Sequence, residues 1–450
     1  MTSNQPIGAS AEVVVRCADA GDTYLTWTWT RGPLTDRLGH PAFKRIAAAE
    51  LGTVMDQLAE SLMPDGTEAA SLAPTAHKET ITERLRASAM MQLGTERELS
   101  GHLGDVILPD QLAGELCVVA DSGTPITVRV TPSTQLSHVP WELLPVSINR
   151  RLLDVATIIT DPPAAAAANR ASDPRLWDRA GDSVYILDPR VPARSGLASV
   201  LDDTSRQILM KYLEEHAESS APVDGRRVTR SHLSQWLRAD EPPSRLFYVG
   251  HVTSEPSEPG SAALHLTDTV GKQKWGMAAA MGANSRHPIE GAHSDDHLPL
   301  SALDLLLGTQ QCHDPIRRKQ LTLGTTGERT PGHEIWPMPP RVAVIACEGG
   351  VDYRSVETFG LIMAILSSGA QMVTTTRWVL PTDHTMRPMS PHPTNPTTEL
   401  IMAVDTAHRS PTPIATLVHW QRLMLAAWSD TGAPEYSPLI WSSLIHTYAP

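Results

Sequence analysis

Short apolar runs alternate with amphipathic stretches through the second half of the chain. The apolar runs predict β-strands at 183–189, 245–251, 341–347 and 371–378. Between them, apolar residues recur three or four positions apart, which predicts helices at 204–218, 231–239, 298–307 and 358–370. Apolar strands separated by helices are typical of a mostly parallel sheet that helices cover on both sides. The pattern therefore predicts an α/β fold with three layers, α/β/α.

The first half of the chain has a weaker pattern of the same kind. Apolar residues at spacings of three and four predict a helix over 42–63. Apolar runs and alternating residues predict strands at 11–18, 114–121, 124–132 and 152–160. No repeat of fixed period is visible, so an array of helical repeats is not expected.

The composition of the connecting segments predicts the domain boundaries. Residues 161–183 combine paired prolines with a run of alanines and are typical of a linker. We therefore expect an N-terminal subdomain over 1–160 and a second domain over 184–450. Two stretches rich in Gly, His, Pro and Thr, about 268–297 and 308–338, are expected to be loops inserted into that second domain.

Length and charge narrow the class of protein. The chain has 450 residues, which favours two subdomains over a single core. Its formal net charge of -13 argues against direct binding to nucleic acid or to an anionic membrane. No apolar stretch approaches the ~20 residues needed to span a bilayer, and the first residues do not resemble a secretory signal. We expect a cytoplasmic protein.

The cysteines and histidines do not follow a metal-binding pattern. The four cysteines, at positions 17, 117, 312 and 347, are too widely spaced for a CxxC pair or a disulfide framework. Five histidines lie near Asp295 and Asp296, but their spacing matches no zinc-binding helix or turn. We therefore expect no cofactor. We also expect the five histidines to be solvated residues of loops, and they are His287, His293, His297, His313 and His333.

Two predicted strands end in reactive side chains. The strand at 245–251 ends in His251, and the strand at 341–347 ends in Cys347. The carboxyl ends of parallel strands meet at one edge of a sheet, and an imidazole near a thiol can accept its proton. Gly349 and Gly350 permit a tight turn whose N–H groups could stabilise an oxyanion. Taken alone, Cys347 is more simply a buried core thiol at the end of a strand, and pairing with His251 is what favours a nucleophile.

Several motifs together resemble a known family. PWELL at 140–144, FYVGH at 247–251 and VIACEGG at 344–350 resemble successive signatures of the CHAT domain, a caspase-like family of cysteine peptidases. The segment 359–383 resembles the family's helix and strand after the nucleophile. Residues 437–448 resemble its closing strand. The resemblance extends from about residue 96 to the end of the chain.

The resemblance implies a fold and a chemistry. It implies a caspase-like protease domain preceded by a degenerate, pseudo-caspase subdomain, with Trp141 and Glu142 in structural roles. Cys347 would be the nucleophile and His251 the general base or ion-pair partner, with Cys347 Sγ roughly 3–7 Å from a ring nitrogen. Peptide-bond cleavage would proceed through a thioester acyl-enzyme. The substrate would be one partner protein, and a separate regulatory protein or the inserted loops would control the activity. The family resemblance also implies a role in bacterial defence or cell death.

One departure from the family keeps an alternative open. The family commonly has Gly-His-Gly, whereas here Gly250 and His251 are followed by Val252. Valine keeps the backbone N–H, a candidate oxyanion donor, but disfavours a positive φ and crowds the site. The alternative is therefore a catalytically weak or inactive caspase-like scaffold that binds a partner protein. A nucleotide-binding protein is not favoured, because no GxxxxGK[ST] loop follows a predicted strand.

Substrate preference has two opposite interpretations. Arg190 or Arg194, after the strand at 183–189, could favour an acidic side chain at the cleavage position. Asp188, or the acidic residues of 201–204, could instead favour a basic one. The sequence alone does not decide between them.

Overall fold

The protein divides into two compact units by its internal contacts. The computed structural model describes residues 10–35, 42–62, 82–163, 170, 174–216, 227–254, 260–271, 277, 280–282, 293–310, 329–346 and 358–449. Unit 1 comprises Met1–Met63, Glu83–Asp161 and Ile414–His446. Unit 2 comprises Pro64–Thr82, Pro162–Pro413 and Thr447–Pro450. The expected second domain, 184–450, thus differs from unit 2, because Ile414–His446 groups with unit 1.

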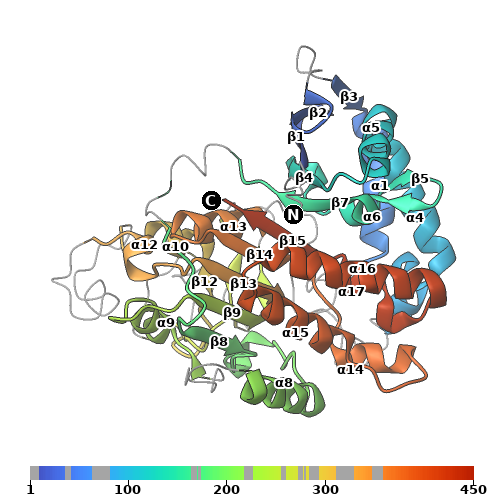
Figure 1. The fold of residues 1–450 in the computed structure, drawn as a ribbon. Helices are drawn as coiled ribbons and strands as arrows, with labels where there is room; N and C mark the ends of the chain where they lie inside the picture. The colour runs from blue at the N-terminus through green and yellow to red at the C-terminus, as the bar shows by residue number, and fades with distance from the viewer. Residues whose placement is uncertain are drawn as a thin grey trace, which may run out of the picture. The chain divides into compact units, whose positions relative to one another are not determined.

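Unit 1 is built on a mixed sheet with the strand order β3-β2-β1-β4-β7 (Figure 1). Strands β1, β2 and β3 are antiparallel, whereas β4 pairs in parallel with both β1 and β7. Along β1, β4 and β7, buried and partly exposed residues alternate, as expected for strands with one covered face. The strands are β1 (Ala11–Ala20), β2 (Asp22–Arg31), β3 (Ala42–Ile46), β4 (Ile126–Thr131) and β7 (Ala156–Thr160).

Unit 1 also contains a hairpin, the start of one more strand, and several helices. The hairpin joins β5 (Pro145–Ser147) and β6 (Arg150–Arg151), and the strand β15 (Leu444–Tyr448) begins in this unit. The helices are α1 (Ala48–Glu60), α4 (Leu93–Ile107), α5 (Asp110–Asp121), α6 (Leu152–Val155), α16 (Pro413–Thr431) and α17 (Pro438–Trp441).

One predicted strand in unit 1 is wrong. Residues 114–121 belong to the helix α5, not to a strand. The buried residues of this helix follow a helical period that becomes visible only when residues 110–113 are included, and they are Leu112, Glu115, Leu116 and Val119. The valine pair at its end favoured a strand, but Val118 is largely exposed.

Two other elements begin later than predicted. The first part of the predicted helix at 42–63 is the strand β3, which pairs with β2, and the helix α1 begins at Ala48. The predicted strand at 152–160 starts with the helix α6, where Asp154 accepts the N–H of Arg151 at 2.7 Å. The first boundary depends on the pairing of β3 with β2, and the second on the hydrogen bond between Arg151 and Asp154. Apolar periodicity reports neither contact.

A buried carboxylate connects three separate segments of unit 1. Glu96 in α4 accepts two hydrogen bonds from the guanidinium of Arg151, at 2.6 and 2.8 Å. It also accepts the indole N–H of Trp428 in α16 at 3.0 Å and the hydroxyl of Ser100 at 2.6 Å. These bonds attach α16, near the end of the chain, to elements of unit 1 that come much earlier in the sequence.

Unit 2 contains a parallel sheet with the order β14-β13-β9-β8. All four strands are buried along their whole length. This confirms the predicted α/β fold with a mostly parallel sheet between helices, because strands covered on both faces are what a three-layer arrangement produces. The strands are β8 (Ser183–Leu187), β9 (Arg245–Gly250), β13 (Arg341–Ala346) and β14 (Met372–Thr376).

Helices cover both faces of this sheet (Figure 1). One face packs in a single apolar cluster with α9 (Arg230–Leu237), α10 (Ala302–Leu307), α12 (Gly332–Ile335) and α13 (Thr358–Ser367). The helix α15 (Pro396–Arg409) contacts β9 and β13 as well as α8 (Asp203–His216), and α14 (Asp383–Met386) contacts α15. A small antiparallel sheet follows β9 and consists of β10 (Val252–Thr253), β11 (Ala263–Leu264) and β12 (Leu300–Ser301).

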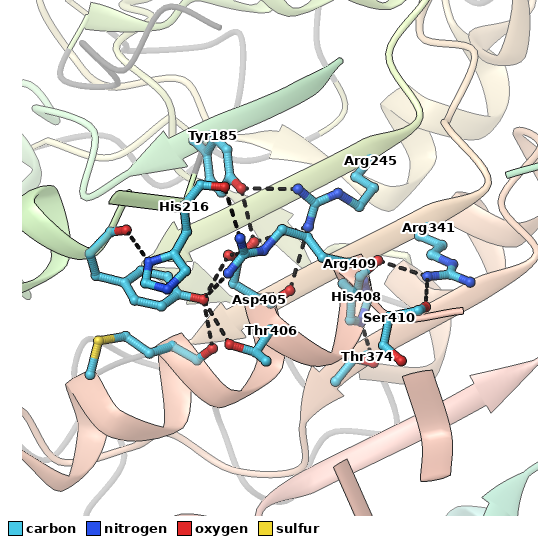
Figure 2. A network of polar contacts seen from close by, with 12 residues as sticks. Tyr185, His216, Arg245, Arg341, Thr374, Asp405, Thr406, His408, Arg409 and Ser410 are labelled. Atoms are coloured by element: carbon cyan, nitrogen blue, oxygen red, sulfur yellow. Dashed lines mark hydrogen bonds and ion pairs between the residues drawn. The ribbon is translucent and has the colours of Figure 1, made fainter. Parts of the chain in front are cut away.

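Buried polar groups anchor α15 to the sheet of unit 2 (Figure 2). The carboxylate of Asp405 accepts the hydroxyl of Tyr185 at 2.9 Å and Arg245 Nη1 at 3.0 Å. It also accepts the hydroxyl of Tyr212 at 3.1 Å and pairs with Arg409 Nε at 3.0 Å. One carboxylate therefore bonds with side chains from β8, β9, α8 and its own helix.

The same figure shows a second anchor at the end of α15. Arg341, the first residue of β13, donates from Nη1 to the backbone oxygens of His408 and Ser410 at 2.7 and 2.6 Å. A guanidinium at these last carbonyls complements the negative end of the helix dipole. Arg245 and Arg341 are the first residues of β9 and β13, so both anchors lie at the opposite end of β9 from His251.

Candidate active site

His251 follows the last residue of β9, at the carboxyl edge of the parallel sheet of unit 2. Strand β9 pairs with β13, and the register places Gly250 opposite Ala346. Cys347, Gly349 and Gly350 lie outside the described residues. The distance between the Cys347 thiol and the His251 ring is therefore still a prediction.

The residue before His251 must be small. A β-carbon at Gly250 would lie 2.7 Å from Tyr248 Oη, 2.9 Å from Tyr248 Cζ and 3.2 Å from Pro189 Cδ. The Tyr248 hydroxyl occupies this place because it donates to the backbone oxygen of His251 at 2.6 Å. The glycine of the FYVGH motif thus permits a tyrosine to support the backbone at the candidate catalytic histidine.

The His251 ring is buried and held by one backbone carbonyl. Its side chain is among the buried polar groups, and Nε2 lies 2.6 Å from the oxygen of Ala198. A carbonyl can only accept, so Nε2 carries the proton of this hydrogen bond. A neutral His251 then has its acceptor lone pair on Nδ1. This is the tautomer that a general base acting through Nδ1 requires.

Asp188 holds the loop that supplies Ala198. It is the only non-glycine residue with a positive φ (49°) in the described part of the chain. Its carboxylate accepts the Val200 N–H at 2.9 Å and is also bonded to Ser199 Oγ and Arg206 Nη2. These bonds turn the side chain toward its own loop and toward α8, so they orient the Ala198 carbonyl.

The other two predicted specificity residues differ from each other. Arg194 Nε donates to Asp296 Oδ1 at 2.7 Å, and the Asp296 side chain is fully buried. Arg190 is exposed on the same loop. Of the three predicted charges, Asp188 and Arg194 are thus engaged within the protein, while Arg190 extends from the loop toward solvent.

Val252 does not need the conformational freedom of a glycine. It begins β10, is buried and pairs with Leu264 of β11. Since Asp188 alone has a positive φ among the described non-glycine residues, the Val252 backbone is free of the strain that a positive φ would impose. The departure from Gly-His-Gly therefore carries no backbone penalty at this position.

The expectation that the clustered histidines are solvated is wrong for His297. Its side chain is fully buried. Its Nδ1 contacts the backbone oxygen of Asp268 at 2.9 Å, and its Nε2 contacts His265 Nδ1 at 3.0 Å. The apolar residues at 298 and 300 were a sequence signal for a buried segment here. His293 is exposed and His333 partly exposed, while His287 and His313 lie outside the described residues.

Two free cysteines, Cys17 and Cys117, lie among the described residues. Burial raises the pKa of Cys17 to about 12, so this thiol stays protonated at neutral pH. Cys117 Sγ lies 3.5 Å from the oxygen of Val146 in unit 1.

Within the described residues, no group of three His, Cys, Asp or Glu side chains is arranged to hold a metal ion. Among the same residues, none of the helices has both the length and the apolar character that crossing a bilayer requires.

Two motifs outside the histidine loop are buried within their own units. Trp141 and Glu142 are both buried in a single turn of unit 1, at Trp141–Leu143. Asp383, at the end of the segment 359–383, accepts the N–H groups of Thr397 and Thr398 at 2.8 and 3.2 Å. It therefore caps the start of α15.

Sequence reasoning missed the groups that support His251. The Ala198 carbonyl is a backbone atom and leaves no trace in residue identity. Tyr248 was visible only as one more apolar residue of a core strand. His265, which also contacts this histidine, stands alone between short apolar runs and has no spacing that distinguishes it.

Comparison with known proteins gives one family match. The model of the CHAT domain family matches residues 97–447. No curated protein matches the chain significantly in sequence. Among solved structures, the chain is similar to the Saccharomyces cerevisiae separase–securin complex at 3.0 Å resolution, with a TM-score of 0.45 and 10% identity. The 2.6 Å structure of that complex gives a TM-score of 0.40 and 9% identity. Each match covers 98% of this chain but only 30% of the other.

Proposed function

Because the chain belongs to the CHAT domain family, we propose that it is a regulated cysteine endopeptidase that cleaves a specific partner protein through Cys347 and His251. The observation that most strongly supports this proposal is the hydrogen bond from His251 Nε2 to the Ala198 oxygen, 2.6 Å long. It selects the tautomer with an acceptor at Nδ1, and it does so at the carboxyl edge of the sheet, where the predicted nucleophile strand also ends.

The proposed reaction uses His251 as base and then as acid. Nδ1 accepts the thiol proton of Cys347 while Nε2–H keeps its bond to the Ala198 carbonyl. The thiolate attacks the carbonyl carbon of the scissile peptide, and the electron pair moves onto the carbonyl oxygen. Backbone N–H groups at Val252 and at the Gly349–Gly350 turn stabilise this oxyanion. The imidazolium then protonates the leaving amine, and the carbon–nitrogen bond breaks.

A second half-reaction regenerates the enzyme. The acyl group remains on Cys347 as a thioester. Water loses a proton to His251 and attacks the thioester carbon, and the thiol leaves with the proton that His251 returns. No cofactor takes part in either half of this proposal.

The proposal extends to the preferred cleavage site. Asp188 and Arg194 are engaged within the protein, and Asp202 pairs with Arg387. Arg190 and Asp203 remain exposed, and of these two Arg190 lies on the loop that carries Ala198. An exposed guanidinium on the loop that carries Ala198 would favour an acidic side chain at the cleavage position. We therefore favour the acidic preference over the basic one.

The proposal also covers the biological setting. A separate regulatory protein, or the inserted segments, would control the activity, and the pathway would be bacterial defence or cell death in the cytoplasm. Family resemblance is the support for this part. The alternative is an inactive scaffold that only binds a partner. The absence of a positive φ at Val252 removes one of the two arguments for it, and crowding of the site by the valine side chain is the other.

The proposal is tested by co-expression with the products of neighbouring genes. Wild-type protein is expected to generate a fragment of one partner that the Cys347→Ala variant does not generate. His251→Ala is expected to abolish the fragment as well, because a general base contributes roughly 10²–10⁴-fold to the rate. His392→Ala, which changes an exposed loop histidine, is the matched control and should cleave normally.

Labelling of the thiol separates an enzyme from a scaffold. A thiol-directed probe should label Cys347 faster in the wild type than in His251→Ala, because loss of the imidazole lowers the thiolate fraction. Equal labelling in both proteins, with no fragment from any partner, would favour the scaffold.

A further inference from the structure

A second histidine lies beside His251 within the protein core. His265 directly follows β11, and its side chain is fully buried. The two rings are nearly perpendicular, at 77°, with their centroids 6.2 Å apart. This contact brings a titratable group that the proposed reaction does not use next to the one that it does use.

The backbones of the two histidines are joined as well. The His265 N–H lies 3.3 Å from the His251 oxygen and 3.1 Å from Tyr248 Oη. The same tyrosine hydroxyl donates to the His251 oxygen at 2.6 Å. Any movement of His265 therefore moves a hydrogen-bond partner of the His251 main chain.

The donor and the acceptor of each hydrogen bond around the His265 side chain can be assigned. His297 Nδ1 must donate to the Asp268 carbonyl, so His297 Nε2 is an acceptor. His265 Nδ1 then donates to His297 Nε2 over 3.0 Å. His265 Nε2 is left to accept the hydroxyl of Thr253, 2.8 Å away. Every ring nitrogen of this pair has a partner when both rings are neutral.

The surroundings keep the pair neutral. Burial lowers the pKa of His265 well below its ordinary value, and the neighbouring His297 and His251 lower it further. Burial is also the largest influence on His297, whose pKa falls to about 4. The charged and titratable side chains that influence the pair are His251 and Arg230. Tyr248 contacts the His265 backbone, and Asp268 contributes its backbone carbonyl to His297. A neutral neighbour does not oppose a positive charge on His251, whereas a protonated one would.

We propose that His265 is a positioning residue for His251, held in place by Thr253 and His297. Its ring is fixed by two hydrogen bonds, its main chain is bonded to that of His251, and the two rings pack nearly at right angles. His265 does not touch the reacting atoms, so its contribution is to the orientation of the His251 ring. This inference rests on the proposed function of His251 as the base for Cys347.

The test follows the reactivity of the Cys347 thiol, which needs no known substrate. Iodoacetamide alkylation of the full-length protein is measured from about pH 5 to about pH 9, with Cys347→Ala as the background. In His265→Phe, a displaced His251 should stabilise the thiolate less. The alkylation rate near pH 7 is then expected to fall about tenfold or more, and its pH midpoint to move toward that of His251→Ala.

Two milder variants separate positioning from simple packing. The amide of His265→Gln can donate to His297 and accept from Thr253, so this variant should keep most of the wild-type rate. Thr253→Val removes the hydroxyl with little change in volume, and we expect a loss of roughly threefold, with the midpoint shifted in the same direction. A purely structural role for His265 would lower the unfolding temperature without moving the pH midpoint.

The outcomes distinguish this inference from the proposed function. A folded His265→Phe protein with the wild-type profile, while His251→Ala shifts it, would overturn the positioning role and leave the dyad intact. A profile that His251→Ala also leaves unchanged would overturn the proposed function itself. Should His265→Phe fail to fold, Thr253→Val decides, and a wild-type profile for that variant counts against the positioning role.

Discussion

At the scale of single residues, internal pairing determines which charges near His251 can meet a substrate. Asp188 is committed to its own loop and to Arg206, and Arg194 to the buried Asp296. Removing the Asp188 side chain would therefore loosen the loop that carries the Ala198 carbonyl. Its main effect would be on His251 and not on substrate preference. Arg190, which is exposed, is the residue where a change of charge should affect recognition alone.

The Arg190→Glu variant tests the proposed acidic preference. We expect cleavage of the natural site to slow by about tenfold or more, because a charge-assisted contact is replaced by repulsion. Replacing the acidic substrate residue by lysine should restore part of the rate for Arg190→Glu only. Arg238→Glu, an equal change at an exposed position after α9, is the control. Unchanged kcat/KM in Arg190→Glu would refute this preference.

At the scale of elements, the two ends of β9 have different tasks. The end of the strand supplies His251, while Arg245 at its start belongs to the network around Asp405. That network is buried, and its carboxylate faces Arg245 and Arg409 together. The desolvation raises the pKa of Tyr212 to about 12, and the nearby Asp405 carboxylate adds to this effect. The network is therefore expected to stabilise unit 2 without entering the chemistry.

The Asp405→Asn variant tests this separation of tasks. It should lower the free energy of unfolding of unit 2 by about 3–5 kcal/mol, because the buried Arg245 and the partly exposed Arg409 lose their counter-charge. Tyr212→Phe removes a neutral hydroxyl that bonds with Asp405 and Arg409 in the same network, and it should cost less, about 1–2 kcal/mol. Urea unfolding followed by circular dichroism measures both. Below the transition, the alkylation rate of Cys347 should be the same in both variants as in the wild type.

At the scale of the whole molecule, the division into units does not follow the order of the sequence. Ile414–His446 groups with the unit formed by the beginning of the chain. Glu96 accounts for part of this grouping, because the same carboxylate accepts Arg151 and Trp428. Burial by itself would raise the pKa of Glu96, but the hydrogen bonds and the charge of Arg151, with smaller contributions from Ser100 and Trp428, outweigh it, so the pKa is lowered.

The lowered pKa predicts how the stability of unit 1 depends on pH. A group whose pKa is lower in the folded state stabilises the fold above its unfolded pKa, and this contribution disappears as the pH falls through the folded pKa. Glu96→Gln should therefore lose about 3–5 kcal/mol at pH 7 and show a flatter decline in acid. Glu98→Gln, an exposed neighbour on α4, should behave like the wild type. Thermal unfolding at a series of pH values below neutrality measures both, and parallel curves for Glu96→Gln and wild type would contradict the assignment.

The sequence by itself determined the layered α/β fold of unit 2 and its family. Strands such as 183–187 and 341–346 are apolar on both faces, and amphipathic segments such as 203–216 have one apolar face, so local patterns were sufficient. The same patterns placed His251 at a strand end. They failed for 114–121, where two adjacent valines outweighed a helical period that only the longer segment displays.

Only the tertiary structure decided what surrounds His251 and which segments form unit 1. The Ala198 carbonyl, the Tyr248 hydroxyl and the His265–His297 pair reach this histidine from separate loops and strands, and no spacing along the chain encodes their approach. Likewise, Glu96 and Trp428 meet across most of the chain. Hydrogen bonds between distant residues depend on where folding brings their atoms, whereas the periodicity of a sequence reports only which face of each element is buried.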